Sequence, residues 1–75
     1  MKGEKTMLEK HKITIKEWEH LMVENIEGTV FISCIMDEVP HHPGTKRFQV
    51  YNEEGSYDEI YDITTDDNGY IIDID

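Results

Sequence analysis

The spacing of apolar residues changes at Gly28, and this change constrains the fold more than any other feature of the chain. Before Gly28, apolar residues recur every three or four positions, as on one face of an α-helix. After Gly28 they alternate with polar residues or form short apolar runs, as in β-strands. Seventy-five residues are enough for one thin core only. The order of the two patterns therefore predicts one α+β domain in which the helix comes first.

The helix is predicted to begin at Thr14, because Thr14 and Glu17 have the spacing of a capping box. Gly28 would end it in a left-handed turn. One face of this helix would be apolar, formed by Ile15, Trp18, Leu21, Met22 and Ile26. Residues 1–12 are a basic segment, for which a flexible chain, a short separate helix and an extension of the main helix all stay open. The single α+β domain would cover residues 13–75.

Four strands are expected after the helix, in the stretches TVFISCIM, RFQVY, SYDEIYDIT and YIIDI. The first is apolar on both faces, which predicts a central strand with Ile32 and Cys34 in the core. Its two faces would hold Val30, Ile32, Cys34 and Met36 on one side and Phe31 and Ile35 on the other. Asn68 and Gly69 would supply the positive φ angles of a tight hairpin. The predicted fold is an N-terminal amphipathic helix packed on a four-stranded antiparallel sheet, with a β-meander at the C-terminus.

Acidic residues dominate the sequence beyond the start of the helix. The chain has 17 acidic and 7 basic residues, and its net charge is −10. Residues 17–75 contain fifteen acidic residues but two basic ones, Lys46 and Arg47. A surface of this sign repels nucleic acid and anionic membranes, and it attracts basic proteins. We therefore expect a basic protein as the partner, and no direct binding of nucleic acid or membrane.

The sequence contains no motif of a known catalytic site. A Gly-rich phosphate loop and a nucleophile elbow are both missing, and among 17 acidic residues pairs arise at almost any separation by chance. The single cysteine, Cys34, excludes an intrachain disulfide and is compatible with a reducing cytosol. No apolar run approaches the length of a membrane-spanning helix, and the first residues lack the apolar stretch of a secretory signal. We expect a cytoplasmic protein that is not an enzyme and needs no cofactor.

The stretch TTDDNGYIIDID matches part of a calcium-binding loop. The matching positions are Asp66, Asn68, Gly69 and Asp75. The first ligand position is Thr64, however, and the last position holds aspartate where glutamate is expected. These mismatches favour a plain hairpin without a metal ion. His41 and His42 are adjacent in a proline-flanked loop with no third ligand nearby, so we interpret them as loop residues whose contact role stays open.

Alternation along SYDEIYDIT predicts which of its side chains share a face. If Tyr57 and Tyr61 face the core, Asp58 and Asp62 point outward, and Asp73 and Asp75 flank them on the last strand. Carboxylates in such a sheet would form a lattice about 5 to 7 Å apart. The partner-binding residues predicted from this pattern are Glu53, Glu54, Tyr57, Asp58, Glu59, Tyr61, Asp62, Asp66, Asp67, Asp73 and Asp75.

In size, acidity and helix-plus-sheet character, the chain resembles small phage-encoded inhibitors, which include nucleic-acid mimics and anti-CRISPR proteins. The resemblance involves no shared motif, so it implies no residue roles. It implies a protein that blocks the basic nucleic-acid channel of a bacterial defence or DNA-processing enzyme, in the cytoplasm of the bacterial host. The alternative is a small bacterial or prophage interaction module, such as an antitoxin or an immunity protein, that does not mimic nucleic acid.

Overall fold

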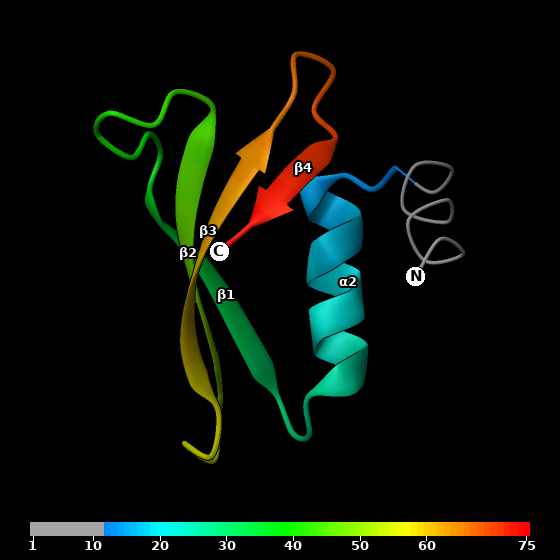
Figure 1. Cartoon of the computed structure of the whole chain (residues 1–75). Coiled ribbons are helices and arrows are strands. Elements are labelled where there is room, and N and C mark those ends of the chain that lie inside the picture. Colours follow the sequence, from blue (N-terminus) through cyan, green and yellow to red (C-terminus); the bar gives the residue numbers. More distant parts are fainter. Residues whose placement is uncertain (1–11) are drawn as a thin grey trace.

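The computed structural model describes residues 12–75. The short separate helix considered for the basic N-terminal segment lies outside the described residues. The elements are α2 (Ile15–Asn25), β1 (Val30–Met36), β2 (Thr45–Asn52), β3 (Asp58–Thr65) and β4 (Ile71–Ile74). The strands form one antiparallel sheet in the order β1-β2-β3-β4, and α2 runs along one face of this twisted sheet (Figure 1). The predicted α+β fold is confirmed.

The helix begins as the capping box predicts. The backbone N–H of Thr14 donates to Glu17 Oε1 (2.8 Å), and the backbone N–H of Glu17 donates to Thr14 Oγ1 (3.3 Å). The predicted end was wrong, because α2 stops at Asn25 and Ile26 is already extended. Ile26 thereby packs against the core while its N–H still donates to Met22 O (3.2 Å). Gly28 does adopt a left-handed conformation (φ +82°), but it shapes the turn into β1.

The core lies between α2 and the sheet. Trp18 is buried, and its ring meets Phe48 (centroids 5.5 Å apart) and Tyr61 (5.6 Å, edge to face). Val50 and Ile63 are completely buried beside this aromatic cluster. Leu21 does not belong to the buried stripe, as its side chain is 46% exposed. In the described part of the chain, no helix is long and apolar enough to cross a membrane.

The position of β1 differs from the prediction of a central strand. It lies at the edge of the sheet and pairs with β2 alone. Ile32 is half-buried at the margin of the core, and Cys34 is exposed. The central strands are β2 and β3, whose core-facing residues are the most buried in the sheet. A strand that is apolar on both faces can thus be an edge strand whose second apolar face is left uncovered.

A β-bulge near the end of β1 changes which face its last residue occupies. Cys34 pairs with Phe48, whereas Met36 pairs with Arg47, the neighbour of Phe48 in β2. Successive residues of a strand point to opposite faces, and Phe48 is buried under the helix. Met36 therefore lies on the face away from α2, and its predicted place beside Cys34 was wrong.

The β3–β4 connection is a hairpin, as predicted, but of a different turn type. Gly69 has a positive φ (+89°), whereas Asn68 does not; among the described residues, the non-glycine residue with positive φ is His41. The N–H of Gly69 donates to Asp66 O, and the N–H of Asp66 donates to Tyr70 O. This pattern is typical of a three-residue loop with glycine at its left-handed position, which needs one positive φ angle instead of two.

Asn52 connects three parts of the chain at the end of the sheet where the turn before β1 meets the β2–β3 turn. Its side chain is buried; Nδ2 donates to Glu27 O (3.1 Å) and Ser56 Oγ (2.8 Å), and Oδ1 accepts from the N–H of Tyr57 (3.0 Å). The N–H of Glu53 also donates to Thr29 O (2.8 Å). These bonds hold the two turns together.

The role of Trp18 can be tested against Leu21, since both are apolar residues of the same helix. Trp18→Ala should lower the free energy of unfolding by about 3 to 5 kcal/mol, because it removes the ring that joins α2 to β2 and β3. Leu21→Ala should cost far less, because Leu21 is largely solvent-exposed. Urea denaturation of both variants measures this. Equal losses of stability would contradict the assigned core.

Candidate protein-binding surface

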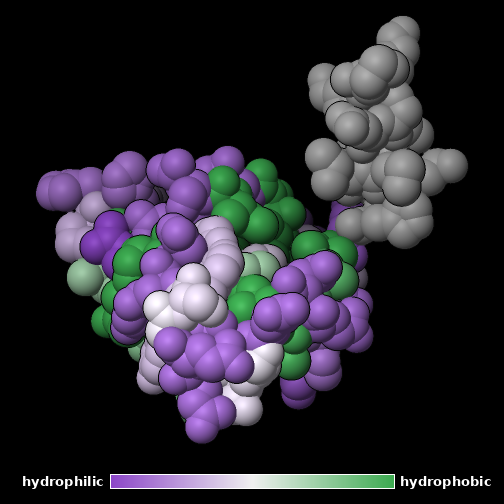
Figure 2. Space-filling view, turned by 90° about the horizontal axis from the view of Figure 1, so that it is seen from below, coloured by the Kyte–Doolittle hydropathy of each residue, from purple (hydrophilic) through white to green (hydrophobic). Residues whose placement is uncertain are grey.

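No described helix covers the face of the sheet opposite α2, and we call it the open face; at one end of it, beside the β1–β2 loop, Thr45 is buried. Strand register and alternation define it, since Phe48, Val50 and Ile63 point to the helix. The open face comprises Phe31, Ser33, Met36, Thr45, Arg47, Gln49, Tyr51, Asp58, Ile60, Asp62, Thr64 and Asp73. It combines apolar side chains with carboxylates, and Figure 2 shows hydrophobic groups at the molecular surface among hydrophilic ones.

Apolar and aromatic side chains occupy one part of the open face. The rings of Phe31 and Tyr51 lie on paired strands, with their centroids 5.3 Å apart. Phe31 and Ile60 remain 42% and 48% exposed, although both belong to residue types that are usually buried. Tyr51 was not among the residues predicted to bind a partner. The alternation of RFQVY could have predicted its exposure, because it places Tyr51 on the other face of the strand from Phe48 and Val50.

Arg47 and Asp62 form a bidentate ion pair on the open face. Arg47 Nε donates to Asp62 Oδ1 (2.8 Å), and Nη2 donates to Oδ2 (3.0 Å). These hydrogen bonds from the guanidinium lower the pKa of Asp62 below its usual range, and those to the carboxylate raise the pKa of Arg47. Asp62 also exchanges two backbone hydrogen bonds with Asp75, so two acidic residues are direct neighbours there. Arg47 therefore offsets a like-charge contact, and the expected lattice of free carboxylates is partly neutralised.

The other predicted open-face acids lie around this pair. Asp58 Oδ1 accepts a hydrogen bond from Gln49 Nε2 (3.0 Å), at the start of β3. Asp73 pairs with Thr64 at the other end of the sheet, and Asp75 follows β4. Of the lysines and arginines in the described part of the chain, the open face holds Arg47 alone, and His42 of the β1–β2 loop lies close enough to Asp62 to lower its pKa further.

The structure separates three predicted residues from these acids. Tyr57, Glu59 and Tyr61 lie on the helix side of β3, as the alternation required. The hydroxyls of Tyr57 and Tyr61 share a hydrogen bond, and Tyr61 also contacts Trp18. Burial, followed by this hydrogen bond, raises the pKa of Tyr61 to about 12. The two tyrosines serve the core and do not share a surface with Asp58.

The remaining predicted acids lie in the two turns that flank β3. Glu53 and Glu54 are exposed in the β2–β3 turn, and Glu54 lies so close to Gly28 that a Cβ there would be 2.9 Å from its carboxylate oxygen. Asp67 is exposed in the β3–β4 turn. Asp66 has a structural task, because its Oδ1 accepts from the backbone N–H groups of Asn68 and Tyr70 (2.9 Å each).

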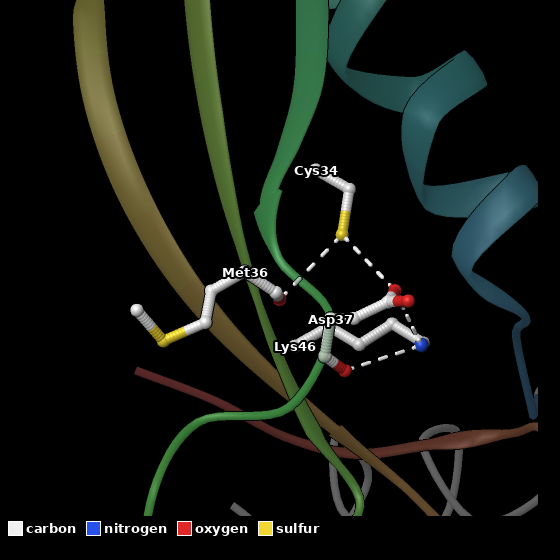
Figure 3. Close-up of polar contacts among 4 residues, drawn as sticks. All are labelled: Cys34, Met36, Asp37 and Lys46. Atoms are coloured by element: carbon white, nitrogen blue, oxygen red, sulfur yellow. Dashed lines mark hydrogen bonds and ion pairs between the residues drawn. The ribbon is translucent and has the colours of Figure 1, made fainter.

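A second polar cluster surrounds the end of β1. Lys46 Nζ lies 3.2 Å from Asp37 Oδ1, and the Cys34 thiol contacts the same oxygen and the carbonyl of Met36 (Figure 3). Lys46 points to the side opposite Arg47 and does not contribute to the open face. Across residues 12–75, no three His, Cys, Asp or Glu side chains gather in a way that could hold a metal ion.

The ion pair predicts a measurable acid titration. Carboxyl NMR should find the pKa of Asp62 below about 3.9, and Arg47→Gln should raise it toward that value. Because the pKa is depressed in the folded state, the pair stabilises the fold at neutral pH, and this contribution is lost as the pH falls from about 4 through the lower folded-state pKa. Lys46→Gln is the matched control and should leave Asp62 unchanged. An unaltered Asp62 titration in Arg47→Gln would refute the pairing.

The β3–β4 turn predicts a weak response to calcium. Asp66 already uses one carboxylate oxygen to hold the turn, so the hairpin lacks a free set of converging ligands. Calorimetric titration with Ca²⁺ in physiological salt should show no saturable micromolar binding. A stoichiometric event that Asp66→Ala abolishes would show that the turn is a metal site after all.

No family model, no curated protein and no solved structure matches the chain. Site residues therefore cannot be transferred to it from a relative.

Proposed function

We propose that this protein is a small acidic inhibitor that acts by binding and not by catalysis. Its contact surface is the open face together with the β2–β3 turn. Its partner is a basic protein, and the best match is a bacterial defence or DNA-processing enzyme whose nucleic-acid channel it blocks. The protein would act in the cytoplasm of a bacterial host, in the manner of phage-encoded inhibitors.

The observation that carries this proposal is the distribution of charge on one side of the sheet. Carboxylates of Asp58, Asp62, Asp73 and Asp75 lie on or beside the open face, and Arg47 is the one described basic residue among them. Glu53 and Glu54 extend the negative surface around the β2–β3 turn. Such a surface attracts a basic groove at long range and repels the nucleic acid that competes for it.

The apolar part of the open face supports binding to a protein. Protein interfaces combine an apolar, aromatic-rich centre with a polar rim. Phe31, Tyr51 and Ile60 are suited to the centre, and Asp58 and the turn acids are suited to the rim. The apolar centre would supply contact area that a purely electrostatic mimic lacks.

The alternative partner is a basic toxin or another protein without a nucleic-acid channel. The aromatic centre suits that partner equally well. Salt dependence and competition distinguish the two, because a mimic is displaced by DNA or RNA and an antitoxin is not.

The proposal is tested by pull-down from a nuclease-treated bacterial lysate, followed by binding and inhibition measurements on the captured protein. Affinity should fall at higher salt, and added DNA or RNA should compete. The variant Asp58→Lys with Asp73→Lys should weaken binding at least tenfold, because it removes two attractions and introduces two repulsions. These positions are preferable to Asp62, whose reversal would also place two cations together at Arg47.

The matched control is Glu24→Lys with Glu38→Lys, which reverses two exposed acids away from the open face, in α2 and in the β1–β2 loop. It makes the same change in net charge, so it corrects for long-range attraction. The control should bind within about threefold of the parent, which corresponds to less than 1 kcal/mol. Equal losses in both variants would refute the open face as the contact surface. Binding without competition by nucleic acid would favour the antitoxin-type partner.

A further inference from the structure

The two edge strands of the sheet differ in whether other described residues pair with their outer edges. At β4, the N–H of Ile71 donates to Ile13 O (2.8 Å), and Thr14 forms a bridge to Tyr70, so the segment before α2 covers part of that edge. At β1, no described element pairs with the outer edge. The β1 edge therefore presents backbone N–H and C=O groups that lack partners within the sheet.

The sequence of β1 lacks most of the features that usually protect an edge strand. Val30–Met36 reads VFISCIM and contains no charged residue and no proline, in a chain of which 32% is charged. Phe31 and Ile35 are 42% and 48% exposed. The bulge after Cys34 ends regular pairing late in the strand and leaves residues 30–34 as a regular edge. A regular, apolar, uncharged edge favours pairing with another strand.

The hydrogen bonds of β1 identify the backbone groups that face outward. The N–H of Glu53 donates to Thr29 O, so residues 29 and 53 are a hydrogen-bonded pair. Such pairs alternate along antiparallel strands, which directs the backbone of Phe31 and Ser33 toward β2. The N–H and C=O groups of Val30, Ile32 and Cys34 therefore point away from the sheet.

We propose that β1 pairs with β1 of a second copy of this chain, to give a two-fold symmetric dimer with a continuous eight-stranded sheet. An antiparallel register centred on Ile32 pairs Ile32 with its equivalent and Val30 with Cys34 of the second copy. All the outward groups are then matched, in about six backbone hydrogen bonds. The same register places Phe31 beside Ser33 of the second copy on the open face.

Charge favours this edge for self-association. Two copies that each carry a net charge of −10 repel one another wherever their acidic surfaces meet. β1 itself carries no charged residue, whereas β4 and the β2–β3 turn carry carboxylates. The acids that flank β1, Glu27, Asp37 and Glu38, lie beyond the residues that pair in this register. A two-fold axis perpendicular to the sheet keeps both helices on one side and joins both open faces on the other. One strand pair buries less than a standard interface, so the dimer should be weak, with a dissociation constant in the micromolar range.

Sedimentation of the full chain from about 1 µM to about 1 mM tests the proposal. A monomer–dimer equilibrium is expected, and added salt should tighten it because salt screens the repulsion between copies. The proposed partner complex should weaken with salt, so the two inferences can fail separately. If the protein is a monomer over the whole concentration range, the proposed dimer is wrong. The same holds if β1 pairs only with a strand of another protein.

A charged substitution in β1 tests whether this edge is the dimer interface. Cys34→Lys should raise the dimer dissociation constant at least tenfold, because the exposed position 34 would bring a cation into each half of the interface. Ile72→Lys is the control, since Ile72 is 63% exposed on the far edge strand, and it should dimerise like the parent. Thermal melting verifies that both variants fold. A dimer that survives Cys34→Lys refutes the β1 interface.

A disulfide tests the register independently. In the proposed pairing the two Ile32 Cα atoms are about 5.5 Å apart, which a disulfide can span. Ile32→Cys in a Cys34→Ser background should form a covalent dimer under mild oxidation. The Cys34 thiols of the parent lie too far apart within the same dimer and should cross-link much more slowly. The reverse order of rates would overturn this register.

Discussion

The packing of Trp18 against Phe48 and Tyr61 determines how the rest of the molecule is arranged. An eleven-residue helix is too short to be stable alone, so α2 depends on the sheet for its stability. The sheet in turn has one described helix to cover it, which leaves its second face in contact with solvent. The open face is thus a direct result of a small core built on a single aromatic anchor.

The open face has a mixed composition. A sheet face that remains in water should be polar, yet Phe31 and Ile60 lie there beside Asp58 and Asp62. Arg47, in β2, lies between β1 and β3 and neutralises Asp62, which has Asp75 as its neighbour on β4. The carboxylates that are not paired with Arg47 therefore lie toward the ends of the strands and in the turns. A partner would meet an apolar strip bordered by acids, which differs from the even lattice expected from the sequence.

Local sequence signals predicted the local structure well. The Thr14 and Glu17 pair defined the helix start, and alternation placed Tyr61 and Asp62 on opposite faces of β3. Two local details were wrong, the end of the helix and the turn type at Asn68. The larger errors concern contacts between distant positions. The apolar character of β1 could not reveal that it is an edge strand. Strand order depends on how the other strands of the chain pair, and the sequence of one strand does not contain this information. The Arg47–Asp62 pair joins positions fifteen residues apart and requires the β2–β3 register, which the alternation alone does not define.

The Asn52 side chain has a consequence for the dynamics of the acidic turn. Because it bonds to Glu27 O, Ser56 Oγ and the N–H of Tyr57, opening either turn at this end breaks hydrogen bonds of a buried amide. Glu53 and Glu54 are consequently displayed on a backbone that is already ordered before any partner arrives. Less conformational entropy is then lost when they are bound. A buried amide thereby restricts the backbone that carries two exposed carboxylates.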